Sequence, residues 1–142
     1  MKWDWSGTIM DTLGIELLEY SRERVVATMP VDGRHHQPFG YMHGGASVVL
    51  AETVASAGSY QFIDPTRQAA VGVEINANHL RSTRSGPVRA TGIPLHVGRR
   101  FLVWDVRIED GEGRLVCVSR CTIGVTDSVQ APKQPGTDLG PA

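Results

Sequence analysis

The segment from Gly44 to Tyr60, GGASVVLAETVASAGSY, constrains the fold of this 142-residue chain more than any other. It is long enough for one helix, and the pair Asp64-Pro65 breaks the chain shortly after it. Between Ala46 and Gly58 its polar residues are Ser47, Glu52, Thr53 and Ser56. A helix that is apolar nearly all round is buried on most sides. The segment therefore predicts a central helix with a single acid, Glu52, in its middle.

Extended segments precede and follow this helix. The sequence RVVATMPV alternates and predicts a first strand, and further long alternating segments follow the helix. Strands are expected at residues 24–31, 70–80, 88–97, 101–109 and 115–125, and the turn DGEG joins the last two as a hairpin. The simplest architecture for one buried helix among such strands is an α+β domain in which an antiparallel sheet wraps around the helix.

Alternation also assigns faces to these strands. One face of 101–109 carries Leu102, Trp104, Val106 and Ile108, and one face of 70–80 carries Val71, Val73, Ile75, Ala77 and His79. Gly92 and Pro94 indicate a bend or bulge in 88–97. Among the first twenty residues, a weak helical pattern places Ile9, Leu13, Leu17 and Leu18 on one side.

The bulk composition fits one globular domain and does not point to a nucleic acid or membrane partner. The chain is 41% hydrophobic and 20% charged, as in soluble globular proteins, and its length suits a single core. Residues 1–125 are expected to form that domain, and 126–142 have so little to bury that we predict a disordered tail. A net charge of -1 gives no reason to expect a nucleic acid or membrane partner.

The cysteines and histidines give no sign of a disulfide or a metal site. On one extended strand, Cys117 and Cys121 would lie ~13 Å apart, which is too far for a bridge. No signal peptide or membrane span is present, so we expect a reduced, cytoplasmic protein. The pair His35-His36 is expected to lie on a loop surface, and because it lacks a second ligand pair we assign no metal.

Glu52 and the start of its helix suggest acyl-transfer chemistry. The residues His43-Gly44-Gly45 stand at the helix N-terminus, where free N–H groups and the positive end of the dipole favour a developing oxyanion. Ser56, one turn after Glu52, can assist the carboxylate or a shared water. Glu52 would then act as a nucleophile or as a base. The alternative is that Glu52 lies on a narrow solvent-facing stripe.

Geometry adds a condition on this site. Gly44 and Glu52 are eight residues apart, ~12 Å along a helix axis, and a Glu side chain does not span that gap. If both act on one carbonyl, they must come from different copies of the chain. We therefore expect an active site across a dimer interface.

Other candidates surround this pair. Gln37 could place its amide near the carbonyl, and His43 is more consistent with a capping role than with a base; no Gly-x-Ser-x-Gly elbow supports a serine nucleophile. The basic segments HLRSTRSG (79–86) and HVGRR (96–100) are either solvated rims or cradles for phosphates. Phosphates combined with a thioester would indicate coenzyme A as part of the substrate, with no separate cofactor.

Three stretches carry a family resemblance: PVDGRHHQPFGYMHGGASVVLAETVASAGSY, VGVEINANHLRSTRSGPVRATGIPLHVGRR and VWDVRIEDGEGRLVCVSRCT. Together they resemble hotdog-fold acyl-CoA thioesterases of the PaaI-like superfamily, over about residues 3–125. The resemblance is closest to 1,4-dihydroxy-2-naphthoyl-CoA thioesterases of menaquinone synthesis and to the enterobactin proofreading thioesterase. The QPFG, HGGAS and LAE motifs make this a specific signal.

The resemblance implies a long helix wrapped by a curved sheet, and homodimers that usually form homotetramers. It implies that Glu52 is the nucleophile or general base, that the Gly44 N–H polarises the thioester carbonyl, and that Gln37, His43 and Ser56 assist. The residues that match segments holding coenzyme A or lining the acyl pocket are Gly72, His79, Arg81, Ser82, His96, Gly98, Arg99 and Arg100.

These expectations favour hydrolysis of an aromatic acyl-CoA thioester, with 1,4-dihydroxy-2-naphthoyl-CoA as one candidate. Departures from close relatives at Tyr41-Met42, at Phe101 and in ASAGSYQFIDPTRQ bear on the acyl group more than on the reaction. A thioesterase of a phenylacetate, hydroxybenzoate or proofreading pathway is an alternative assignment. Two further alternatives to a thioesterase are a non-catalytic acyl-CoA-binding protein on the same fold and a dehydratase of enoyl thioesters that uses His43.

Overall fold

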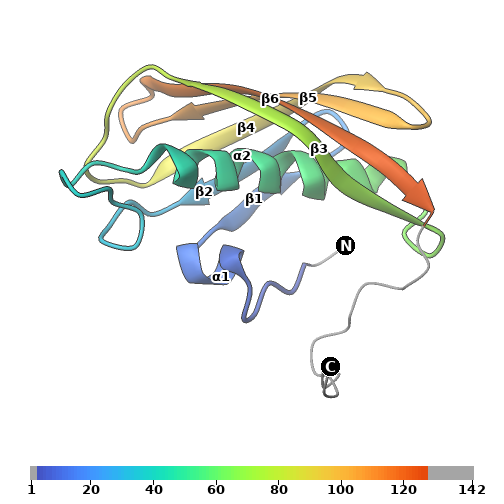
Figure 1. Cartoon of the computed structure of the whole chain (residues 1–142), viewed down its shortest axis with the longest axis horizontal. Helices are drawn as coiled ribbons and strands as arrows, with labels where there is room; N and C mark the ends of the chain where they lie inside the picture. The colour runs from blue at the N-terminus through green and yellow to red at the C-terminus, as the bar shows by residue number, and fades with distance from the viewer. Residues whose placement is uncertain (1–2, 128–142) are drawn as a thin grey trace.

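The computed structural model describes residues 3–127 and shows one curved sheet folded over one long helix (Figure 1). All neighbouring strands are antiparallel, in the order β1-β2-β4-β5-β6-β3. The elements are α1 (Ile9–Leu13), β1 (Glu16–Tyr20), β2 (Val25–Met29), α2 (Gly44–Ser59), the 3-10 helix η1 (Tyr60–Phe62), β3 (Gln68–His79), β4 (Val88–Val97), β5 (Phe101–Glu109) and β6 (Leu115–Asp127). The predicted α+β architecture is confirmed.

The core lies between α2 and the concave face of the sheet. The side chains of Leu102, Trp104, Val106 and Ile108 are fully buried there, as their alternation predicts. Trp104 is the largest of them: its Nε1–H donates to Ser59 Oγ at 2.9 Å, and a Cβ at Gly58 would lie 2.5 Å from its ring. The helix therefore packs closely against the centre of the sheet at Trp104.

One face of α2 is not covered by the sheet. Its half-buried residues are Gly44, Val48, Val49, Glu52, Thr53 and Ser56, whereas Leu50, Ala51, Val54 and Ala55 on the sheet side are fully buried. The helix is thus buried on the sheet side as expected. In a single chain, however, the acid lies on a half-exposed stripe.

The N-terminal region differs from the sequence-based expectation. The helix α1 ends at Leu13, because Gly14 adopts a left-handed conformation with φ of 69°. Leu17 and Leu18 follow in β1 and are not part of a helical face. The helical pattern fails because a glycine cap interrupts the segment after five residues.

The edge strand β3 also differs from the prediction. A bulge shifts its register on β6 between Gly72 and Glu74. Val71 and Val73 are exposed, by 43% and 56%, while Ile75 and Ala77 pack against the core. The expected single face is wrong, because one extra residue in a strand exchanges its two faces.

The remaining strands agree with the predicted segments within a few residues. A register shift between Pro94 and His96 confirms the irregularity expected in β4. The strand β6 continues to Asp127, two residues past the expected end of the domain, and the rest of the predicted tail lies outside the described residues.

Both cysteines lie on β6, as the extended segment predicted, and both are buried and free. Within residues 3–127 no helix is long and apolar enough to cross a membrane. The same part of the chain contains no group of three His, Cys, Asp or Glu side chains placed to hold a metal ion.

Candidate active site

The N-terminus of α2 opens into a polar pocket of about 330 Å³, called here the N-terminal pocket. Its lining is Gln37, Met42, Gly44, Ser47, His79, Leu80, Arg81, Ser82, Thr83 and Val116. Five predicted site residues therefore meet in one chain. The imidazole of His79 lies against the helix start, since a Cβ at Gly44 would be 2.8 Å from His79 Nε2.

The local structure of the helix start explains why this pocket offers a donor. His43 is the N-cap residue, and its Nδ1 accepts the Gly45 N–H at 2.8 Å. Among the hydrogen bonds of residues 3–127, none uses the N–H of Gly44. That N–H stands at the positive end of the helix dipole, where it suits an oxyanion. His43 thus has the capping role that its position favours.

Gln37 reaches the same pocket from the preceding loop. Its N–H donates to Tyr41 O at 2.8 Å, and its side-chain Oε1 accepts the Phe39 N–H. With the oxygen occupied by the loop itself, the amide NH₂ group is left to donate. The arrangement supplies a second donor beside Gly44.

Glu52 and Ser56 lie in a different cavity, an apolar groove of about 380 Å³ that we call the α2 groove. Its walls are α2 and the N-terminal segment, with Trp3, Trp5, Ile9, Met10, Val49, Glu52, Thr53, Ser56, Ala57 and Tyr60 as lining residues. Trp3 and Tyr60 pack edge to face with ring centroids 5.2 Å apart. Among the described residues, 3–127, no hydrogen bond joins Ser56 to Glu52. The groove combines an aromatic wall with one acid.

One chain therefore separates the two halves of the predicted site. Gly44 and Gln37 line the N-terminal pocket, and Glu52 and Ser56 line the α2 groove. Gly72, expected near coenzyme A or the acyl group, lies beside the acid: a Cβ at this position would be 3.2 Å from Glu52 Cδ.

The second basic segment is far from the first. His96, Gly98, Arg99 and Arg100 lie at the β4–β5 hairpin, where Val97 pairs with Leu102 and Leu102 with Ile123. His79, at the end of β3, pairs with Cys117. Six residues of β6 separate these points, ~20 Å along a strand. Figure 1 shows the two loops at opposite ends of the sheet, so one chain does not gather them into a single cradle.

The buried cysteines do not offer a reactive thiolate. Burial raises the pKa of the Cys121 thiol to about 12, and the charges of Glu52 and Glu74 act in the same direction. Burial also raises the pKa of Cys117. Both thiols are therefore protonated at neutral pH and are poor nucleophiles.

Comparison with known proteins identifies the family. The model of the thioesterase superfamily matches residues 39–117, a range that includes the helix start, Glu52 and the loop after β3. The chain belongs to the thioesterase superfamily. Its six-stranded antiparallel sheet and single long helix match hotdog-fold thioesterase structures, which confirms the resemblance seen in the sequence.

Individual members of the thioesterase superfamily are similar over most of their length. The Bacillus subtilis protein ComA2 is 56% identical over 86% of this chain and 97% of its own. The 1,4-dihydroxy-2-naphthoyl-CoA hydrolase of Escherichia coli is 48% identical over 84% of this chain and 87% of its own. A crystal structure of a Pseudomonas aeruginosa thioesterase has a TM-score of 0.84 and 46% identity, covering 86% and 88% of the two chains.

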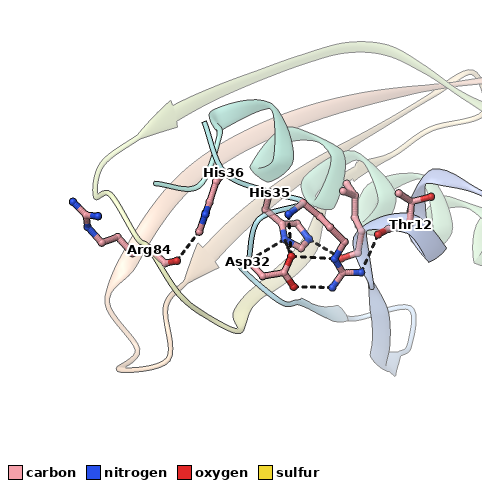
Figure 2. Close-up of polar contacts among 7 residues, drawn as sticks. Thr12, Asp32, His35, His36 and Arg84 are labelled. Carbon is pink, nitrogen blue, oxygen red and sulfur yellow. Dashed lines mark hydrogen bonds and ion pairs between the residues drawn. The ribbon is translucent and has the colours of Figure 1, made fainter. Parts of the chain in front are cut away.

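This thioesterase-superfamily chain also contains a buried histidine that sequence reasoning missed. His35 was expected on a loop surface but is only 1% exposed. Its Nδ1 accepts the Asp32 N–H at 3.1 Å and its Nε2 lies 2.8 Å from Leu13 O (Figure 2). Because the N–H only donates and the carbonyl only accepts, both contacts are satisfied by the tautomer that carries its proton on Nε2. The acidic residue Asp32, three positions before His35, is the one feature of the sequence that could have indicated a hydrogen-bonded position for this histidine.

The loop around His35 is fixed by charge as well. Arg34 makes two hydrogen bonds to the Asp32 carboxylate, at 3.0 and 2.8 Å, and Nη1 donates to Thr12 O at 3.0 Å (Figure 2). The hydrogen bonds from Arg34 hold the pKa of the Asp32 carboxyl well below its ordinary value. The loop is thereby attached to the C-terminal end of α1.

These contacts position the start of α2. The carbonyl of His35 accepts the His43 N–H at 2.7 Å, and the His36 Nε2 lies 2.8 Å from Arg84 O. Met42 donates its N–H to Thr83 O at 2.8 Å. The loop that carries Gln37 is therefore closed at its base, which holds it beside the N-terminal pocket.

Replacing His35 with Ala should lower the free energy of unfolding by about 2 to 4 kcal/mol, because it removes a fully buried side chain and leaves the partly buried Asp32 N–H and Leu13 carbonyl without their partner. Urea unfolding followed by tryptophan fluorescence measures the change. His36→Ala is the matched control, with an expected loss of about 1 kcal/mol or less, since this side chain is partly exposed and makes one hydrogen bond. Equal losses for the two variants would contradict the anchoring role of His35.

Proposed function

We propose that the protein hydrolyses aromatic acyl-CoA thioesters to the free acid and coenzyme A, in sites shared by two copies of the chain. The observation that carries this proposal is the division of the site: Gly44 borders one pocket and Glu52 another, and both contact the edge strand β3. A site divided in this way becomes complete when a second copy supplies the missing half.

The edge strand offers a simple way to bring the halves together. Gly44 contacts His79, and Glu52 contacts Gly72, seven positions earlier on β3. In an antiparallel pair of two β3 strands centred between Ile75 and Asn76, His79 of one copy stands opposite Gly72 of the other. Such pairing about a two-fold axis would place each Gly44 near the partner copy's acid, in two equivalent sites. It would also extend the sheet through its open edge.

The chemistry then follows from the groups present. The carbonyl oxygen accepts hydrogen bonds from the Gly44 N–H and the Gln37 amide, which stabilise the negative charge of a tetrahedral intermediate. The Glu52 carboxylate attacks the carbonyl carbon, or takes a proton from a water that does so, and Ser56 assists it. Collapse of the intermediate breaks the C–S bond, and the departing thiolate takes up a proton. Where Glu52 itself attacks, this leaves a mixed anhydride on its carboxylate, and water then hydrolyses the anhydride to free the acid and restore Glu52. Where water attacks, the free acid forms directly. Water is consumed, and the products are a carboxylic acid and free coenzyme A.

The α2 groove supports an aromatic acyl group with two fused rings. A cavity of about 150 Å³ lined by apolar side chains is large enough for benzene, and this groove is about 380 Å³. Relatives from Escherichia coli and Listeria monocytogenes are named 1,4-dihydroxy-2-naphthoyl-CoA hydrolases. We therefore propose this naphthoyl ester as the substrate, in menaquinone biosynthesis.

The coenzyme A half of the ester would lie along Arg81 and Ser82, which border the N-terminal pocket. His96, Gly98, Arg99 and Arg100 are at the other end of the sheet, so they would reach the phosphates from another copy, in a homodimer or a homotetramer. The free cysteine thiols favour the cytoplasm as the compartment.

A thiol-release assay with a panel of esters tests the proposal. We expect kcat/KM to be at least about tenfold higher for 1,4-dihydroxy-2-naphthoyl-CoA than for benzoyl-, phenylacetyl- or palmitoyl-CoA. The reason is that the two fused rings fit the wide apolar groove and bury more aromatic surface there. A higher kcat/KM for one of the other esters would reassign the substrate. Binding without thiol release from any ester would rule out hydrolysis in favour of an acyl-CoA sensor or a dehydratase.

A further inference from the structure

A glycine of the edge strand lies directly against the acid of the site. The three atoms nearest to a Cβ built on Gly72 all belong to the Glu52 side chain: Oε1, which such a Cβ would overlap, Cδ at 3.2 Å and Cγ at 4.0 Å. The carboxylate therefore rests on the backbone of β3. A side chain at position 72 would occupy the place of the carboxylate oxygen.

The glycine is not required by the backbone conformation. The glycines with a left-handed φ are Gly7, Gly14, Gly40 and Gly113, and Gly72 is not among them. Alanine is thus compatible with the backbone at this position. The conflict of a methyl group at position 72 is with Glu52.

The bulge in β3 explains how Gly72 comes to face α2. Gly72 pairs with Ile123 and Glu74 with Thr122, so Val73 is an extra residue without a partner of its own. Val71, Gly72 and Val73 are all exposed in one chain, and of the three Gly72 is the one that faces the Glu52 side chain of the helix. Bulges next to active sites re-aim the residues around them.

We propose that Gly72 is a positioning residue that seats the Glu52 carboxylate for catalysis, an inference that rests on the function proposed above. The absent side chain lets the carboxylate lie against β3, at the edge where a second copy would bring its Gly44. A misplacement of about 1 Å at a reacting group lowers the rate by roughly a hundredfold. The size of residue 72 therefore controls where the acid stands.

The test is a double-mutant cycle. Gly72→Ala should lower kcat for the aroyl-CoA ester about a hundredfold with little change in KM, because it displaces the acid and leaves the ester-binding surfaces intact. Combining Gly72→Ala with Glu52→Asp should restore kcat at least about tenfold over Gly72→Ala alone, since the shorter acid makes room for the methyl group. If the fold-loss in kcat of the double variant equals the product of the fold-losses of the two single variants, the inference is overturned.

A matched control separates this effect from general crowding. Gly124 lies on the neighbouring strand β6, and a Cβ there would be 2.9 Å from Val73 Cγ2, away from Glu52. Gly124→Ala should keep kcat within about threefold of the wild type. If Gly72→Ala has as small an effect as this control, the inference is wrong.

A measurement independent of activity distinguishes this inference from the proposed function. The effect of Gly72→Ala on Tm should be less favourable with Glu52 present than in a Glu52→Ala background, where no carboxylate has to move aside for the methyl group. An equal change of Tm in both backgrounds would refute the seating contact. Full activity of Glu52→Ala would instead refute the proposed function and leave the contact standing.

Discussion

Replacing Glu52 with Gln lowers kcat for aroyl-CoA hydrolysis by at least about a thousandfold and leaves the fold intact. The amide has the size of the acid, but it neither attacks a carbonyl nor accepts a proton from water. Stability should change little, because Glu52 is half-buried and makes no ion pair or hydrogen bond among residues 3–127. Steady-state thiol release and thermal unfolding measure the two effects.

The control for this prediction is Glu109→Gln, which removes the same charge from an exposed position at the end of β5. It should retain wild-type kcat, so that a loss in the Glu52 variant cannot be assigned to net charge. A Glu52→Gln protein that keeps more than about a tenth of the wild-type kcat would show that another group performs the chemistry.

Mixing two inactive variants should restore activity. A Glu52→Gln chain keeps its N-terminal pocket, and a Gln37→Ala chain keeps its acid; each alone should lose about a hundredfold or more in kcat. If each site takes Gly44 and Gln37 from one copy and Glu52 from the other, a mixed dimer contains one site with both groups intact. Random pairing makes half of the dimers mixed, so about a quarter of all sites should become active.

The mixture is best prepared by unfolding the two variants together in equal amounts and refolding them, with each variant refolded alone as the control. Recovery near a quarter of wild-type activity supports a site built from two copies. No recovery, with refolding verified by circular dichroism, would mean that each chain carries its whole site, because every chain in the mixture has one defect.

Much of the fold was predictable because its patterns are simple. Strict alternation in residues 101–109 placed Trp104 and its neighbours in the core, and the apolar run after Gly44 gave the helix within a residue of its observed end. The faces of β3 were not predictable, since nothing in the sequence marks the extra residue at Val73 that exchanges them. Registers depend on the neighbouring strand, which local patterns do not describe.

The candidate site, like the fold, was predictable only in part. Gly44 was expected to bind the thioester carbonyl, and the resemblance implied that Arg81 holds the coenzyme A part of the same ester; the structure brings both residues into one pocket. The buried position of His35 was missed, because a His-His pair in a polar loop resembles a surface feature until its contacts with α1 are known. In the proposed site, whether Glu52 meets Gly44 depends on how two copies pair, and the sequence of one chain constrains this only through the distance between the two residues.

The unpaired edge of β3 has a practical consequence for enzymology. If two copies must join along that edge before either can turn over substrate, specific activity falls when the protein is diluted below the dissociation constant of the pair. Rates taken at nanomolar and micromolar enzyme would then differ without any change in chemistry. Variants of this protein are comparable only at a common chain concentration, and a dilution series gives the affinity of the two copies as a by-product.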